Sequence, residues 1–219
     1  MSLELSGTTP AIKGVAGSVS APAITGDDAD TGISFPSANT IKFSTGGVER
    51  ISISDAGISG TGISAGGKFA SYAIIGDEKS AGTDGGVFTS GAWRTRDLNA
   101  ELSDPDGIVS ISSNQFTLAA GSYLVVASAP ALGVNNHKLK IYNITDSADV
   151  QIGTSEYAHA SDYSTKRSFV SSRFTISGSK VFEIQHRCET TKSTTGMGRG
   201  YYSMGAVELF TLVEIYKES

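Results

Sequence analysis

Short runs of alternating apolar and polar residues recur along this chain between turn-forming sequences, and no stretch of ten residues carries a 3.6-residue apolar period. A helical bundle needs that longer period and many strong helix formers, whereas 26 of the 219 residues are glycine. Apolar residues make up 39% of the chain and the net charge is −5, a composition that supports a folded core. The sequence therefore predicts an all-β protein.

The C-terminal two thirds of the chain carry the longer strand patterns. These patterns are bounded by turn sequences rich in Gly, Pro and Asp, and they cover residues 116–118, 123–127, 139–142, 168–176, 181–188 and 207–216. Within the run 181–188, Phe182 and Ile184 share the expected core face, while Glu183 and Gln185 lie on the opposite face. Some 150 residues with regularly spaced strands favour a sandwich, a jelly roll or a barrel.

The N-terminal segment shows a hairpin but no large core. Residues 40–45 and 48–53 alternate on either side of Gly46-Gly47, a dipeptide typical of tight hairpin turns. A lone two-stranded hairpin is marginal in water, so we expect this segment to need other copies of the chain. Five of the residues 57–67 are glycine, which indicates a connector. The predicted domains are residues 1–60, a Gly-rich linker at 61–67, and residues 68–219.

Two short patterns resemble catalytic loops, and both are interpreted as chance matches. Residues 62–66 fit the G-x-S-x-G motif of hydrolases around Ser64, but no helix pattern follows to form the strained turn that exposes such a serine. Residues 62–68 nearly match a phosphate-binding loop, but Phe69 replaces the Ser or Thr that would bind Mg²⁺. No catalytic residue is predicted, and we expect a protein that is not an enzyme.

Metal and cofactor sites are not predicted either. The carboxylates of residues 27–30 could hold Ca²⁺, but a solvated turn is the favoured interpretation. His137, His159 and His186 lack ligand spacing, and His186 is expected to be a satisfied core histidine. Cys188 is the only cysteine and is expected to be a buried, inert thiol on the Phe182 face. No cofactor is expected.

Nucleic acid and membrane are not expected partners. The sequence pI is about 5.2, and the Lys and Arg residues are scattered rather than clustered. The longest strongly apolar stretch, residues 123–132, is too short to cross a bilayer. The first residues show neither a basic region nor a long apolar run, so no signal peptide is expected.

Two expected loops stand out by their aromatic content. Residues 156–163 carry Tyr157, His159 and Tyr163 among small polar residues, and Tyr201 and Tyr202 follow a Gly-rich run. Tyrosines with small polar neighbours are typical of adaptable binding surfaces, because each ring offers stacking area and a hydroxyl group. The alternative is that these tyrosines pack at a subunit contact or on the sheet.

Part of the N-terminal segment resembles a known structural element. Residues 22–33 (PAITGDDADTGI) and 41–50 (IKFSTGGVER), followed by residues 54–57 (SDAG), are similar to a segment common in the fibres of tailed bacteriophages. In those proteins the segment lies in a thin trimeric shaft. The resemblance implies that residues 1–60 form a short, trimeric, β-rich shaft that attaches to the virion. One such segment is present, so the projection is expected to be short.

The C-terminal part resembles a second family. Residues 104–109 (DPDGIV), 116–123 (FTLAAGSY), 127–131 (ASAPA) and 181–188 (VFEIQHRC) are similar to the C1q/TNF-like jelly-roll heads of phage and bacterial fibres. This resemblance implies a jelly-roll sandwich over residues 68–219 and association into trimers.

Together, these features lead to one leading hypothesis and one alternative. The leading hypothesis is a homotrimeric virion fibre that is assembled in the host cytoplasm and acts outside the cell. Its N-terminal segment would contact other virion proteins, and its head would bind a host-surface glycan or protein through Tyr157, His159, Tyr163, Tyr201 and Tyr202. The alternative is a capsid decoration or head-fibre protein with a purely structural role. A polysaccharide hydrolase is disfavoured, because such enzymes usually place paired carboxylates in a groove of a much longer chain.

Overall fold

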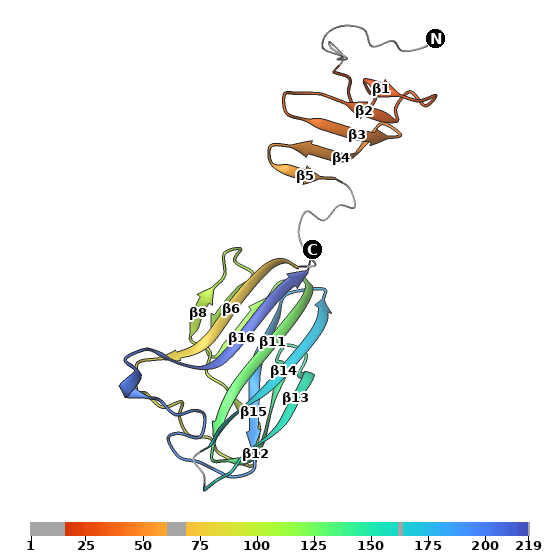
Figure 1. Ribbon diagram of the computed structural model, residues 1–219. Coiled ribbons are helices and arrows are strands. Elements are labelled where there is room, and N and C mark those ends of the chain that lie inside the picture. The colour runs from red at the N-terminus through yellow and green to blue at the C-terminus, as the bar shows by residue number, and fades with distance from the viewer. Residues whose placement is uncertain (1–15, 61–68, 162–163, 219) are drawn as a thin grey trace. The chain divides into compact units, whose positions relative to one another are not determined.

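The computed structural model describes residues 16–60, 69–161 and 164–218, and the chain divides into two compact units, Met1–Gly67 and Lys68–Ser219 (Figure 1). The described residues form sixteen strands and, as their one helical element, the 3-10 turn η1 (Tyr202–Met204). The prediction of an all-β protein is confirmed. The predicted Gly-rich linker at residues 61–67 lies outside the described residues.

The N-terminal unit is an antiparallel sheet in which each strand pairs with the next along the chain. The predicted hairpin is confirmed, because Thr45 pairs with Val48 across Gly46 and Gly47, whose φ angles of 59° and 69° are those of a type I′ turn. The sheet is larger than predicted, and Gly57 belongs to its last strand rather than to a connector. The strands are β1 (Ile24–Thr25), β2 (Gly32–Ser34), β3 (Ile41–Thr45), β4 (Val48–Ser54) and β5 (Gly57–Ser59).

One face of this sheet is apolar and uncovered within the unit. The strand register places seven apolar side chains on it, in two rows: Ile24, Ile33, Phe43 and Ile51, and then Ile41, Ile53 and Ile58. Among the described residues of this unit no apolar side chain is buried, and the buried side chains are Ser34 and Ser44. The unit therefore does not cover its own apolar face.

The C-terminal unit, called the head below, is a sandwich of two antiparallel sheets. The first head sheet consists, in spatial order, of β14 (Thr165–Ile176), β11 (Gly121–Leu132), β16 (Glu208–Glu218), β6 (Phe69–Lys79) and β8 (Ala100–Ser103). The second head sheet consists of β13 (Ala148–Ala158), β12 (Asn135–Asn143), β15 (Lys180–Cys188), β10 (Gln115–Leu118) and β9 (Val109–Ser112), and β7 (Arg94–Thr95) also pairs with β15.

The path of the chain between these sheets is that of a jelly roll. From β11 the chain passes to the second sheet for β12 and β13, returns for β14, crosses again for β15 and returns for β16 (Figure 1). This repeated crossing between two antiparallel sheets is Greek-key wrapping, and it confirms the predicted jelly-roll sandwich.

The inner faces of both head sheets supply one apolar core. Phe182 and Ile184 are fully buried in it, as predicted, and the ring of Phe182 stacks on Phe116 at a centroid distance of 5.5 Å. Glu183 lies on the opposite face of β15, as predicted, but its side chain is buried there as well. Thr95 of β7 covers it and donates a hydrogen bond of 2.9 Å to Glu183 Oε2.

The two ends of the head differ in what they carry. Phe69 and Glu218 are paired, so the described head begins and ends at one end. From there β6 runs eleven residues toward the opposite end, a distance of about 35 Å for extended strand. The opposite end is called the distal end below. It is formed by residues 80–93, 133–134, 159–161, 164 and 189–207.

Candidate binding surface at the distal end

The first group of predicted binding residues lies at the end of β13. Residues 156–163 were predicted as a loop, but β13 continues to Ala158, so Tyr157 is a strand residue. Its side chain is 51% exposed, and its ring meets that of His159 edge to face at 5.9 Å. His159 Nδ1 accepts a hydrogen bond of 3.2 Å from the Ser161 backbone. Tyr163 lies outside the described residues.

The second group sits on the loop before β16, and its backbone is firmly held. Tyr201 and Tyr202 are 48% and 83% exposed. The carboxylate of Glu208 accepts hydrogen bonds from the backbone of Tyr201, at 2.6 Å, and of Gly82, at 3.0 Å. Gly82 has a φ of +74°, and a Cβ placed there would lie 2.8 Å from the Tyr202 Cβ. The tyrosines are thus presented on an ordered turn.

The distal end brings these two groups to the same end of the head but gives them different neighbours. Tyr157 lies on β13, an edge strand of the second head sheet, and Tyr202 packs against the loop that follows β6 of the first. Lys192 lines a polar hollow with Gly200 and also lies beside Gly133, where Ala160 approaches. The two groups therefore lie on different segments of the distal end.

An open groove of about 670 Å³ at the distal end was not predicted from the sequence. Its walls come from the segment before β7, the start of β12 and the ends of β13 and β15, and they include Trp93, Asn136, Lys138, Glu156, Arg187 and Glu189. Trp93 is the only tryptophan of the chain. The groove adjoins the first tyrosine group, because its Asn136 is the cross-strand partner of Tyr157.

The side chain of Trp93 is held by a buried cation. Lys140 Nζ lies 4.5 Å from the centroid of the Trp93 ring and 4.7 Å from that of Tyr142. Lys140 is 5% exposed and also forms an ion pair of 2.5 Å with Asp149. These contacts fix the indole ring before any ligand arrives.

A pair of buried histidines lies beside the groove. The register of β12 against β15 places His137 Nδ1 3.0 Å from His186 Nε2, and His137 belongs to the groove lining. Burial lowers the pKa of His137 to about 4 and the pKa of His186 well below its usual value. Within the described part of the chain, His137 Nε2 and His186 Nδ1 have no hydrogen-bond partner. His186 is therefore buried as predicted but only half satisfied.

Cys188 is buried as predicted, one strand away from His137. Its thiol contacts the backbone oxygens of Phe88 and Thr190 at 3.8 and 3.5 Å. Burial raises the pKa of this thiol to about 11, which keeps the thiolate form rare at neutral pH.

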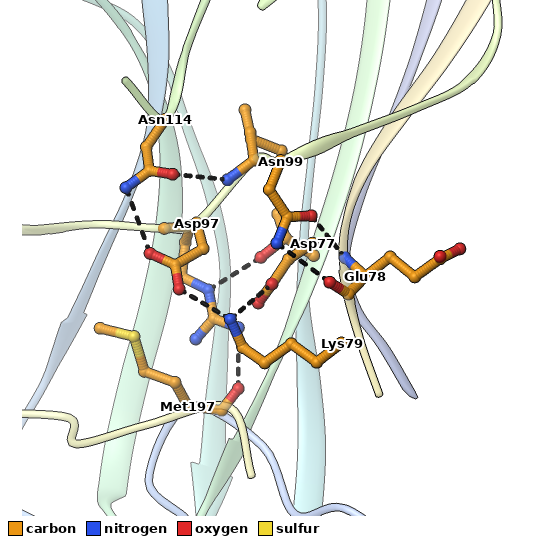
Figure 2. A network of polar contacts seen from close by, with 10 residues as sticks. Asp77, Glu78, Lys79, Asp97, Asn99, Asn114 and Met197 are labelled. Atoms are coloured by element: carbon orange, nitrogen blue, oxygen red, sulfur yellow. Dashed lines mark hydrogen bonds and ion pairs between the residues drawn. The ribbon is translucent and has the colours of Figure 1, made fainter. Parts of the chain in front are cut away.

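A polar network lies beneath the loops of the distal end. Arg96 is fully buried and donates hydrogen bonds to Met197 O at 2.7 Å and to Thr211 Oγ1 at 3.0 Å. Figure 2 shows the adjoining contacts, in which Lys79 Nζ lies between the carboxylates of Asp77 and Asp97 at 2.8 and 2.9 Å. Burial raises the pKa of Asp77 despite this ion pair. Through Met197, the network fixes the long loop between β15 and β16.

The patterns considered for catalysis and metal binding have different outcomes. Ser64 and the rest of residues 62–68 lie outside the described residues. The cluster at residues 27–30 is an exposed turn in which Thr31 Oγ1 donates a hydrogen bond of 2.6 Å to Asp28. Across residues 16–60, 69–161 and 164–218 no group of three or more His, Cys, Asp or Glu side chains is arranged to hold a metal ion.

The same described ranges contain no helix long and apolar enough to cross a membrane.

Comparison with known proteins finds similarity only at the level of structure. No family model matches the chain, and no curated protein matches it in sequence. The globular domain of zebrafish complement 1qA is 14% identical, with a TM-score of 0.41, over 67% of this chain and 96% of that one. The PRD1 vertex protein P5 is 13% identical, with a TM-score of 0.41, over 70% of this chain and 100% of that one. Eiger TNF from S. frugiperda is 8% identical, with a TM-score of 0.45, over 68% of this chain and 92% of that one. At these values the fold assignment rests on the strand order itself.

Proposed function

We propose that this chain is a homotrimeric fibre protein of a bacteriophage virion and that the distal end of its head binds the host cell surface. The observation that carries the proposal is the polarity of the head. The described head begins and ends at one end, and the exposed tyrosines and the groove lie about 35 Å away at the other. A shaft joined at the first end leaves the second free to meet a cell.

The role of the N-terminal unit in this proposal is that of the shaft. Its residues 22–57 resemble the shaft segment of phage fibres, and its sheet carries an apolar face that nothing within the unit covers. Burying this face against two further copies of the chain would remove it from water, which is the main driving force for association. The unit would also contact other virion proteins.

The first head sheet supplies a second surface for trimer contacts. Its outer face carries Leu124 and Val126 of β11 and Leu212 of β16, all half-buried, with Tyr72 and Phe169 at 44% and 50% exposure. Exposed and half-buried apolar side chains gathered on one sheet face mark an interaction surface, and Glu214, the cross-strand partner of Val126, lies among them. We assign it to the contact between heads.

Size-exclusion chromatography with light scattering tests the trimer. The full chain is expected to elute with three times the 22.7 kDa mass of one chain. Val126→Asp would bury a charge in the proposed contact and should shift the mass toward the monomer. Ser110→Asp, on an exposed position of the second head sheet, is the matched control and should leave the trimer intact. A wild-type monomer at micromolar concentration contradicts the proposal.

Adsorption competition tests the binding role. The full-length protein added to host cells should slow the adsorption of whole phage, and changing Tyr157, Tyr201 and Tyr202 to Ala should weaken that competition while the trimer persists. Asp106→Ala, on an exposed loop outside the distal end, is the control. Gold-labelled antibodies should mark a fibre tip on the virion. A folded trimer that does not compete, with label spread over the capsid, would instead establish a decoration protein.

A further inference from the structure

The groove beside Trp93 has the features of a ligand site that adjoins Tyr157 but is lined by other residues. We propose that it binds an uncharged saccharide unit of the host surface, with the indole ring of Trp93 as the stacking wall. This inference rests on the proposed function, because it names the ligand class that the distal end would recognise. It adds a site that the aromatic loops themselves do not contain.

The shape of the site suits one or two sugar rings. A volume of about 670 Å³ lies within the range of small-ligand sites, about 300–1,000 Å³. Sugar rings bind by laying their apolar C–H faces on an aromatic ring while their hydroxyl groups form hydrogen bonds at the edges. Trp93 supplies the ring, and its contact with Lys140 keeps that ring in one orientation. Little side-chain freedom is then lost on binding.

The charges of the lining favour a neutral ligand over an anionic one. Lys138 and Arg187 bring two positive charges, and Glu156 and Glu189 bring two negative charges. The carboxylate of Glu189 is already held by Asn136, whose backbone and side-chain nitrogens donate to Oε2 at 3.2 and 2.6 Å. A phosphate or a sugar carboxylate would therefore meet no net positive field.

Uncharged polar groups complete the lining. Ser90, Ser155 and Asn136 line the groove and offer hydroxyl and amide groups that can pair with sugar hydroxyls. The groove thus combines an aromatic wall with neutral hydrogen-bonding groups.

The test uses the full-length trimer and an array of purified bacterial surface polysaccharides, some neutral and some carrying phosphate or carboxylate groups. We expect binding to neutral polysaccharides, with little change between about 0.05 and 0.5 M salt, because no net charge is paired. Bound ligand should shift the fluorescence of Trp93, which reports on the groove alone because the chain has no other tryptophan. Trp93→Ala should weaken binding by at least about tenfold.

Two further variants show whether a loss of binding comes from the groove itself or from a misfolded protein. Ser155→Tyr fills the groove from an exposed strand position and should also abolish binding while leaving Trp93 in place. Arg187→Gln removes a positive charge from the lining and distinguishes the two ligand classes, because it should weaken binding of an anionic polysaccharide far more than binding of a neutral one. Circular dichroism and the trimer mass should match the wild type in all three variants.

The outcomes separate this inference from the proposed function. Host-cell binding that survives Trp93→Ala and Ser155→Tyr but is lost with the tyrosine variants overturns the groove site alone. Binding only to charged polysaccharides, lost at high salt and in Arg187→Gln, also overturns it and replaces the neutral sugar with an anionic one. A wild-type trimer that binds neither cells nor any polysaccharide overturns both proposals.

Discussion

The buried histidine pair makes the stability of the head depend on pH in a direction that the structure determines. The pKa of His137 is 6.5 in an unfolded chain and about 4 in the folded head, because burial disfavours the charged ring. The gap between these two pKa values corresponds to a maximum change of about 3.4 kcal/mol in the free energy of unfolding from this one residue. Nearby Glu156 acts in the opposite direction and Arg96 in the same direction.

The sign of the effect follows from which state binds the proton. Above pH 6.5 both states hold neutral histidine, so the pair contributes no pH dependence. Below pH 6.5 the unfolded chain takes up a proton that the folded head refuses, and stability falls as the pH falls toward 4. Lowering the pH from about 7.5 to about 5 should lower the free energy of unfolding by about 2 kcal/mol through His137. His186, whose pKa is lowered as well, adds a loss of the same sign.

Urea unfolding at a series of pH values measures this loss, with protomer concentration held constant because trimer stability depends on it. His137→Gln should reduce the pH dependence between pH 7 and 5 by the share that His137 contributes and leave that of His186, even though it lowers stability at neutral pH by disturbing His186. Gln151→Ala, at an exposed position of the neighbouring strand β13, removes no titrating group and should leave the slope unchanged. The reasoning fails if wild-type stability is equal at the two pH values, or if His137→Gln keeps the full slope.

Two further substitutions test the network and the core. Arg96→Met removes a buried guanidinium that donates to Met197, Thr211 and Pro130, and should cost about 3–5 kcal/mol in denaturant unfolding, with faster amide exchange in residues 189–207. A loss below about 1 kcal/mol, or unchanged exchange in that loop, would show that the loop is held by other contacts. Ile184→Asp places an unpaired charge in the apolar core and should prevent folding, whereas Arg187→Asn, exposed on the same strand, should change stability by less than about 1 kcal/mol. Similar soluble yields and melting temperatures for the two variants would mean that the strand faces are misassigned.

The sequence predicted the strands whose two faces differ in polarity. Phe182 and Ile184 reveal their face because polar residues lie between them, and Gly46-Gly47 specifies its turn because only that geometry needs two positive φ angles. β13 was not predicted, since most of its residues are exposed and show no alternation. Its strand conformation comes from pairing with β12, which no local pattern encodes.

The groove and the buried polar groups could not be predicted because they depend on contacts between distant segments. His137 and His186 are 49 residues apart and meet only through the register of β12 on β15. Arg96, within the sequence Arg94-Thr95-Arg96-Asp97, has the pattern of a surface charge, yet its partners lie more than 30 residues away. The one available signal was Trp93, a single large aromatic residue within a polar segment.

One buried and one half-buried arginine explain how a head built from an apolar core can hold the distal end in one arrangement. Arg167 donates to Phe210 O at 2.6 Å and to Ser128 O at 3.1 Å, and Arg96 donates to Met197 O at 2.7 Å. Met197 belongs to the long loop and Phe210 to the first residues of β16, so both attachment points flank the tyrosine turn. Apolar packing tolerates small sliding of a loop, whereas a guanidinium that loses a buried acceptor leaves a charge unpaired. A surface fixed in this way loses little entropy on binding, so weak contacts on each of three proposed heads could add to a firm attachment.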